Sequence, residues 1–557
     1  MTLPFPRTDR RWLRLAVLVV GLCWPGSMGA QGSGAAPALE DPILRAMSAE
    51  LERSRDKLQL DQASRPYYIE YSVTDLDEYS ADASFGALVL ENRQRSRVLR
   101  AVVRVGNYDQ DSYFGAGQGQ VQFAVLGEDE LALRHQLWLA TDAAYKNAVA
   151  SLSAKQALLK NLSVKQTVDD FSREPAQRAI DPLVKVEMDA ASWRTRVRDL
   201  SRLFRQDPEI DSAVNFSWRG SNRYFINTEG TVSRRGYALY VLYFTGTTQA
   251  ADGMRLTHSR DWVVARPEEL PSPEVTTAAA RKLIATLGEL RRAPIVEDSY
   301  RGPVLFAADA AKMIFWNLIG PAITGDQPAP GDTARTTGEF ASHYKTRVLP
   351  DFLSIEDDPT ASSFRGRALV GSYDMDDEGA KARRVSVVER GVLMNYLMGR
   401  RPILDFPRSN GHGRAAPGAS PVPSFSNLFV RSEQPLTFEQ LKQKLIDQCR
   451  SMGRPYGYLV ESTSNSLVPV VLYRIWVEDG REELVRGAAF AQLDARALRS
   501  DLIAAGDDAQ ADNSNEPIPK AVINPSVLFS ELEVRRATQA SEKLPSIPPP
   551  GLASAAP

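Results

Sequence analysis

The chain has 557 residues, enough for about two to four domains and a large core. Hydrophobic residues make up 43% of it and charged residues 24%, which is ordinary for a soluble globular protein. The formal net charge of -2 gives no reason to expect nucleic acid or an anionic membrane surface as a partner.

The N-terminus has the three parts of a secretory signal peptide. Arginines up to Arg14 precede a short apolar run over 15–22, and small residues follow. The run is shorter than the ~20 residues that span a bilayer, so a permanent anchor is the weaker alternative. We expect a signal peptide over 1–30, a periplasmic or secreted mature protein, and no membrane span after signal removal. Removal of Cys23 leaves Cys449 as the single thiol, so no intrachain disulfide is expected.

Residues 31–164 are predicted to form an N-terminal α/β domain. Apolar residues at helical spacing predict helices over 41–58 and 131–162. Runs of aromatic and β-branched residues predict strands over 67–73, 85–91 and 97–105.

Residues 165–299 are predicted to form a middle α+β domain. Ser192 is expected to cap a helix with an apolar stripe that starts at Trp193. The segment Thr228-Glu229-Gly230 reads as a hairpin turn. The remaining elements are strands over 213–218, 223–227 and 237–244 and a packed helix over 273–292.

Residues 300–536 are predicted to form a third, β-rich domain. A short apolar strand at 303–306 leads into a buried helix over 310–319, which Gly320-Pro321 ends. That helix carries no His, Glu or Cys. The polar segment 327–343 is long enough to be either a functional lid or a disordered loop, and the sequence does not decide between these two interpretations.

Further elements are expected towards the C-terminus. Thr437 and Gln440 predict a capping box on a helix over 438–452, with Cys449 on its buried face. Strands are expected over 348–355, 468–477 and 522–534, and the polar segment 506–519 is expected to loop out. The Pro-rich tail, 537–557, is expected to be disordered.

Three sequence pieces recur together in the third domain. They are Asp-Asp-Glu-Gly at 376–379, a hairpin at 388–393, and Ser-Asn-Gly-His-Gly-Arg at 409–414 before a Pro-rich run. This order resembles the TldD/PmbA family, also called the modulator-of-DNA-gyrase peptidases. The resemblance implies an α+β fold with an N-terminal α/β domain, a middle α+β domain and a β-rich C-terminal domain.

The resemblance also implies how such proteins work. TldD-like and PmbA-like (TldE-like) subunits pair around an enclosed cavity that admits unfolded peptide. The TldD-like subunit is a metallopeptidase with two His and a Glu on one helix, spaced to share a zinc ion and activate its water. Aligned with that helix, this chain has Trp316, Asn317 and Pro321 at the three positions. The family's third ligand is a C-terminal Cys, and 485–534 contains none.

The zinc site is therefore expected to be absent, with no catalytic or metal-binding residue in this chain and zinc in a TldD-like partner. His412 is interpreted as a loop histidine that makes backbone hydrogen bonds, in preference to a ligand. The acidic run 374–378 is interpreted as a solvated turn, in preference to a cation site. For a peptide cleft we single out polar loop groups and a glycine, namely Asn410, Gly411, His412 and Asn427.

The sequence thus predicts an exported TldD/PmbA-family protein, metallopeptidase-related, that serves as a non-catalytic PmbA/TldE-like subunit. It would hold an extended peptide by strand addition. It would either pair with a zinc-bearing TldD-like subunit in proteolysis, as a hetero-oligomer, or associate with further copies of itself. One alternative is an active metallopeptidase with a rearranged metal site. The other is a stand-alone periplasmic peptide-binding or scaffold protein.

Overall fold

A computed structural model describes residues 40–60, 63–163, 166–296 and 299–538. The signal peptide predicted over 1–30, and 539–557 of the Pro-rich tail, lie outside the described residues. Among the helices that are described, none combines the length and the hydropathy needed to cross a membrane.

A seven-stranded sheet is built from two long antiparallel hairpins. β1 and β5 pair along most of their length, which joins the hairpins. The strands are β1 (Pro66–Ser84), β2 (Ala87–Val105), β3 (Gln120–Phe123), β4 (Arg178–Ile180), β5 (Asp211–Asn227), β6 (Val232–Gln249) and β7 (Arg255–Val264). Their order is β3-β2-β1-β5-β6-β4, and β7 also pairs with β6. Stretches 31–164 and 165–299, predicted as separate domains, thus contribute strands to one sheet.

Two strands are longer than their apolar patterns suggested. The strands predicted over 85–91 and 97–105 form one strand, β2, and those over 213–218 and 223–227 form one strand, β5. The residues between them stay in register with β1, whose backbone groups satisfy theirs, although most of the linking side chains in β2 are exposed to solvent. The turn at Thr228-Glu229-Gly230 is confirmed between β5 and β6.

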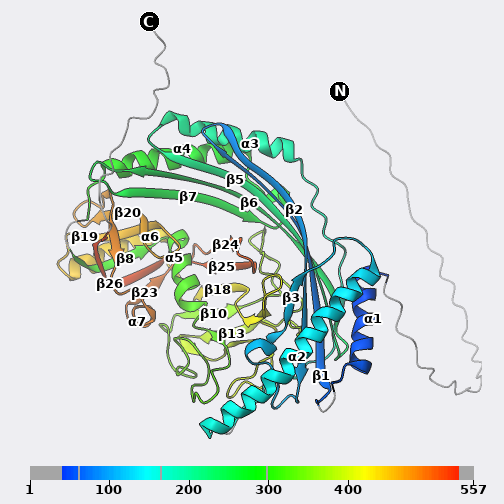
Figure 1. Ribbon diagram of the computed structural model, residues 1–557. Helices are drawn as coiled ribbons and strands as arrows, with labels where there is room; N and C mark the ends of the chain where they lie inside the picture. The colour runs from blue at the N-terminus through cyan, green and yellow to red at the C-terminus, as the bar shows by residue number, and fades with distance from the viewer. Residues whose placement is uncertain (1–39, 61–62, 164–165, 297–298, 539–557) are drawn as a thin grey trace, which may run out of the picture. The chain divides into compact units, whose positions relative to one another are not determined.

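Four helices lie on one face of this sheet, and the C-terminal elements lie on the other (Figure 1). The helices are α1 (Pro42–Lys57), α2 (Glu130–Leu162), α3 (Ala190–Arg202) and α4 (Pro273–Arg292). The expectation for Ser192 is wrong, because the Asp189 carboxylate caps α3 and accepts from the Ser192 backbone N–H. A carboxylate beside the positive end of the helix dipole makes a strong cap.

Within the described residues, the C-terminal region contains two larger sheets and three two-stranded ones, which pair β9 (Thr324–Gly325) with β15 (Leu397–Met398), β11 (Ser363–Phe364) with β12 (Arg367–Ala368), and β16 (Gly413–Arg414) with β17 (Val422–Pro423). A seven-stranded sheet has the order β21-β20-β19-β8-β26-β22, with β23 on β26. Its strands are β8 (Tyr300–Phe306), β19 (Tyr456–Thr463), β20 (Pro469–Trp476), β21 (Glu482–Val485), β22 (Ala488–Phe490), β23 (Leu502–Ala505) and β26 (Val527–Arg536). A six-stranded sheet has the order β14-β13-β10-β18-β25-β24. Its strands are β10 (Leu353–Asp357), β13 (Val385–Glu389), β14 (Val392–Leu393), β18 (Asn427–Ser432), β24 (Gln510–Ser514) and β25 (Lys520–Asn524).

Three helices accompany these sheets, namely α5 (Ala308–Ile314), α6 (Phe438–Ser451) and α7 (Ala495–Ser500). α6 confirms the predicted capping box at Thr437 and buries Cys449. Within the segment 506–519, which was expected to loop out, residues 510–514 form β24 because their backbone pairs with β25. Residues 327–343 contain turns but neither helix nor strand.

The buried helix predicted over 310–319 changes its winding halfway. α5 is α-helical to Ile314, and Phe315–Ile319 continue as a π-helical turn. The Gly320 N–H donates to the Phe315 carbonyl at 2.9 Å, an i to i+5 bond. Such turns occur often at functional sites, and this one contains Trp316 and Asn317.

Candidate functional site

A cleft of about 780 Å³ lies between two strand edges. Within the described strands, β7 pairs only with β6, and β24 pairs only with β25. Residues 257–262 of β7 line one wall and 510–516 line another, with α5 and the loop 462–466 between them. Figure 1 shows β7 above β24 with α5 beside them. The cleft therefore exposes two sheet edges to one shared space.

At one end of the cleft, the Asn513 side-chain amide joins β24 to β7. The Asn513 side chain on β24 donates to the Val263 carbonyl of β7 at 3.1 Å and to the Ala368 carbonyl at 2.9 Å. The two sheet edges are therefore in contact at that end.

Trp316 and Asn317 line this cleft. The Trp316 ring packs edge to face on Phe425, with 5.0 Å between centroids, and the Lys520 ammonium lies 5.4 Å from the Trp316 ring centroid. The Asn317 amide donates to the carbonyls of Met313 at 3.0 Å and Asn465 at 2.9 Å. These side chains are held by packing and by backbone acceptors.

These residues do not fit a zinc ion. The indole N–H of Trp316 is a donor only, the Asn317 amide has no basic group, and the Pro321 side chain has no donor atom. Within the part of the chain that the structure describes, no group of three or more His, Cys, Asp or Glu side chains could hold a metal. Cys449 lies in α6, where burial raises the pKa of its thiol to about 11.

The cleft wall carries an ion-paired lysine. The Lys312 ammonium on α5 lies 2.9 Å from the Asp309 carboxylate and 3.1 Å from the Asp512 carboxylate on β24. Burial lowers the pKa of Lys312, but the two carboxylates outweigh it and the net shift is upward. On β7, burial lowers the pKa of His258, which keeps its imidazole neutral near neutral pH. Lys312 thus joins α5 to β24 as a cation and is not a free base.

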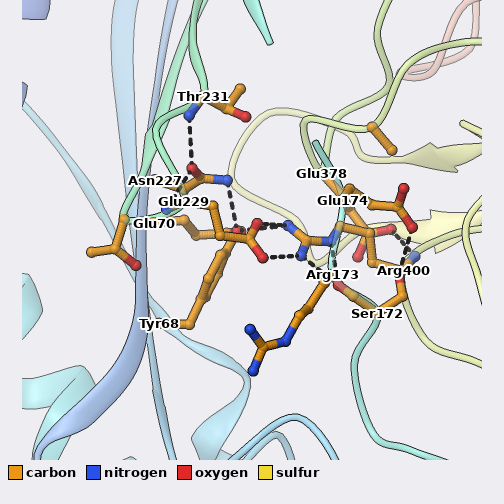
Figure 2. Close-up of polar contacts among 12 residues, drawn as sticks. Tyr68, Glu70, Ser172, Arg173, Glu174, Asn227, Glu229, Thr231, Glu378 and Arg400 are labelled. Carbon is orange, nitrogen blue, oxygen red and sulfur yellow. Dashed lines mark hydrogen bonds and ion pairs between the residues drawn. The ribbon is translucent and has the colours of Figure 1, made fainter. Parts of the chain in front are cut away.

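A second polar cluster joins the long sheet to the C-terminal loops (Figure 2). The buried Arg400 guanidinium donates to Glu229 in the β5–β6 turn at 2.8 Å and to the Ser172 carbonyl at 3.1 Å. The Arg400 backbone N–H donates to the Glu378 carboxylate at 2.6 Å. This cluster fixes the sheet relative to the loops that carry the acidic run.

The acidic run is buried, so the solvated turn expected over 374–378 is wrong for three of its members. Asp376, Asp377 and Glu378 are 1%, 6% and 7% exposed. The Asp376 carboxylate accepts from three backbone N–H groups, those of Glu378, Ala380 and Gly413. Burial and then the neighbouring Glu378 raise the pKa of Asp376 to about 8.

The four residues predicted for a peptide cleft hydrogen-bond inside the protein, and none of them lines the cleft. His412 is fully buried, with Nε2 3.0 Å from Asp357 and Nδ1 2.9 Å from the Asn410 side chain. The Asn427 amide donates to two backbone carbonyls of 358–361. Gly411 is buried at φ +81°, where a Cβ would lie 2.3 Å from a backbone oxygen. His412 Nδ1 also lies 3.2 Å from the Asn410 backbone carbonyl, as expected, and the Asp357 carboxylate is an additional partner that was not predicted.

The sequence of the C-terminal half is similar to known metalloproteases. A family model described as "PmbA/TldA metallopeptidase C-terminal domain" matches residues 299–536. A "Metalloprotease" of Methanothermobacter thermautotrophicus is 23% identical over 280 residues, 50% of this chain and 56% of that protein. A second "Metalloprotease", from Archaeoglobus fulgidus, is 25% identical over 170 residues, 30% of this chain and 35% of that protein. The chain thus spans about half or less of the length of these relatives.

Solved structures share the fold over most of the chain. A putative modulator of a DNA gyrase from Thermotoga maritima has a TM-score of 0.57 at 16% identity and covers 88% of this chain and 99% of its own. TldE from Thermococcus kodakarensis has a TM-score of 0.58 at 12% identity and covers 88% of this chain and 100% of its own. These matches confirm the predicted α+β fold class.

Proposed function

This chain belongs to the TldD/PmbA family, and we propose that it acts there as a non-catalytic, PmbA/TldE-like subunit that binds extended peptide. The observation that carries the proposal is the position of Trp316 and Asn317. They line the cleft between the two strand edges, at the positions where the TldD-like helix has a His and the Glu. A cleft that has no metal ligands at these positions favours peptide binding over peptide hydrolysis.

The cleft geometry supports strand addition as the binding mode. The backbone of 257–262 lines the cleft along β7, which has one unpaired edge among the described strands. An extended peptide can satisfy those N–H and C=O groups with its own main chain, which binds it with little dependence on side chains. The ion pair of Lys312 with Asp512 joins α5 to β24, and so holds this wall of the cleft in place before the peptide arrives.

The proposal includes a partner and a location. We propose that a TldD-like subunit supplies the zinc and the general base, and that peptide held here extends into its site. Export to the periplasm or outside is proposed from the signal-like pattern at 1–30. An active peptidase with a rearranged site and a stand-alone binding protein are the competing outcomes of the test below.

The test measures binding and cleavage of one fluorescein-labelled unstructured peptide by the purified protein. We expect saturable binding by fluorescence anisotropy and no cleavage by mass spectrometry, with or without added zinc. Thr257→Trp places a large ring on the cleft wall, and we expect it to weaken binding at least about tenfold, or 1.4 kcal/mol. Asp56→Ala, at an exposed position on α1, is the matched control.

Three results would overturn parts of the proposal. Cleavage that depends on zinc would mean an active peptidase. Binding that is equal in wild type and Thr257→Trp would place the peptide elsewhere. Binding without any complex with a zinc-bearing family member from the same source would favour the stand-alone protein.

A further inference from the structure

Three arginines converge on one carboxylate at the inner face of the long sheet. The Asp377 carboxylate lies 3.5 Å from Arg223, 3.0 Å from Arg235 and 3.1 Å from Arg414. Arg223 comes from β5, Arg235 from β6, and Arg414 from the short strand β16 (Gly413–Arg414). Three positive groups thus share one negative group, and we call Arg223, Arg235 and Arg414 the arginine cluster.

The strand register makes this arrangement costly. Arg223 pairs directly with Arg235 across β5 and β6. Like charges directly opposite in an antiparallel pair repel each other, and burial strengthens that repulsion. Burial, followed by the other arginines, outweighs Asp377 and lowers the pKa of Arg223. A purely structural clamp on Asp377 would not need two opposed guanidinium groups.

The other carboxylates of the acidic run do not balance the arginine cluster. The Asp376 carboxylate accepts from backbone N–H groups, and Arg235 reaches only the Asp376 carbonyl. Its raised pKa of about 8 also keeps Asp376 largely protonated at neutral pH. Glu378 accepts from the backbone of Arg400. An excess of positive charge therefore remains at the cluster.

Each arginine of the cluster also has one buried N–H donor without a hydrogen-bond acceptor in the part of the chain that the structure describes. The Nε atoms of Arg223 and Arg235 and Nη1 of Arg414 are buried and have no hydrogen-bond partner within the described residues. Arg414 is only 8% exposed as a residue. The side chains keep 13%, 15% and 10% exposure, for Arg223, Arg235 and Arg414 in turn, so a small group can reach them. Buried N–H donors without acceptors are costly, and an oxyanion would satisfy several at once.

A second pocket next to the cleft lies on the sheet face that carries Arg223. This smaller pocket of about 230 Å³ shares Val241 and Asn515 with the cleft and is lined by Arg219 and Leu239. Arg219 precedes Arg223 by four residues on β5, so both lie on the same face, about 13 Å apart along the strand. The smaller pocket and the arginine cluster therefore lie on the same face of the sheet.

We propose that Arg223, Arg235 and Arg414 form an oxyanion-binding site for a carboxylate or phosphate group. Guanidinium groups bind both anions through paired N–H donors. One source is the carboxylate of a bound peptide, either its C-terminus or an acidic side chain, and this source rests on the proposed peptide binding. The other source is free inorganic phosphate, which does not.

The first arm of the test measures thermal unfolding in inorganic phosphate and in acetate, with chloride holding the ionic strength constant. A ligand that binds only the folded state raises the Tm with its concentration. We expect that rise in wild type and in the control Arg431→Gln, an exposed arginine, and not in Arg223→Gln. Arg223 donates to the Ala415 carbonyl through Nη1, which glutamine is too short to replace, so circular dichroism is used to check that the variant folds.

The second arm measures the affinity of one peptide as its free acid and as its C-terminal amide. We expect the acid to bind about tenfold more tightly in wild type and equally in Arg223→Gln. A Tm response to phosphate without this preference assigns the site to free anions and still supports it. If no peptide binds, peptide binding has failed and the phosphate arm alone decides the site.

Two results overturn the inference. One is a Tm that neither anion changes, together with equal affinity for acid and amide. The other is a rise of the Tm with anion concentration that is equal in wild type and in Arg223→Gln, because the anion would then bind elsewhere. Arg223→Lys, which keeps the charge, is expected to retain part of the anion response.

Discussion

Arg400 and Glu229 form a buried two-point ion pair, with Nη1 2.8 Å from Oε2 and Nη2 2.8 Å from Oε1. The pair connects a loop of the C-terminal region to the hairpin turn of the long sheet (Figure 2). Because the cleft has walls from both regions, this contact helps to hold together the two parts of the protein that form the candidate site.

Removing the guanidinium tests this role. Arg400→Leu leaves Glu229 without its partner, and we expect it to lower the free energy of unfolding by roughly 3–5 kcal/mol. Urea denaturation measures the loss. Arg55→Leu, in a pair whose side chains are 59% and 63% exposed, is expected to change it by less than about 0.5 kcal/mol. A similar small loss at Arg400 would show that the pair contributes little.

The buried carboxyls Asp376 and Glu378 predict a pH dependence. Burial and the neighbouring Glu378 raise the pKa of Asp376 to about 8, and burial raises the pKa of Glu378. The folded state therefore keeps protons that the unfolded chain releases near pH 4. The stability that this pair contributes is complete below that pH and is lost as the pH rises through about 8.

Glu378→Gln should reduce this loss, since glutamine removes the neighbouring charge and can still accept from the Arg400 N–H. At pH 9 we expect the variant to be more stable than wild type by on the order of 1 kcal/mol, with the advantage shrinking as the pH falls. Glu439→Gln, on the exposed side of α6, is the control and should show no such trend. An advantage at low pH instead would contradict the assignment.

A pair of glycines tests whether the loop at Gly411 is structural. Gly411 and Gly366 have nearly the same φ, +81° and +82°, but only Gly411 has backbone atoms where a Cβ would lie. Gly366→Ala is expected to cost roughly 1–2 kcal/mol through backbone strain alone, and Gly411→Ala to cost more because it also clashes. Thermal unfolding measures both. A Gly411→Ala protein that is stable but fails to bind peptide would restore the loop as a peptide contact.

Restoring the TldD-like helix residues tests the missing third ligand. Trp316→His, Asn317→Glu and Pro321→His together supply two imidazoles and a base. Zinc sites in proteins use three or more protein ligands, and 485–534 contains no Cys. We expect the triple variant to lose its zinc on dialysis against a weak chelator. Retention of one zinc per chain would reveal a third ligand elsewhere in the chain.

Elements with local signals were predicted well from the sequence. α4 has the predicted bounds, and α6 has the predicted cap at Thr437. In both helices the capping hydroxyl side chain, Ser272 or Thr437, comes directly before a run of apolar residues at helical spacing. β7 was missed because charged residues such as Arg260 and Asp261 interrupt its pattern, and its position comes from pairing with β6.

The polar interior could not be predicted, because its partners are distant in the sequence. Asp377 pairs with Arg235, which lies 142 residues away. Seen alone, the acidic run has the composition of a solvated turn, and only the tertiary contacts show that arginines surround it. The candidate site was predictable at Trp316 and Asn317, which the alignment singled out, but not at the walls that β7 and β24 contribute.

The most direct test of the central proposal is the zinc content per chain of the purified mature protein after dialysis against a weak chelator. For a non-catalytic subunit we expect near-zero zinc, with the peptide bound and not cleaved. About one zinc per chain, together with cleavage of the peptide, would contradict the account and identify the protein as an active peptidase.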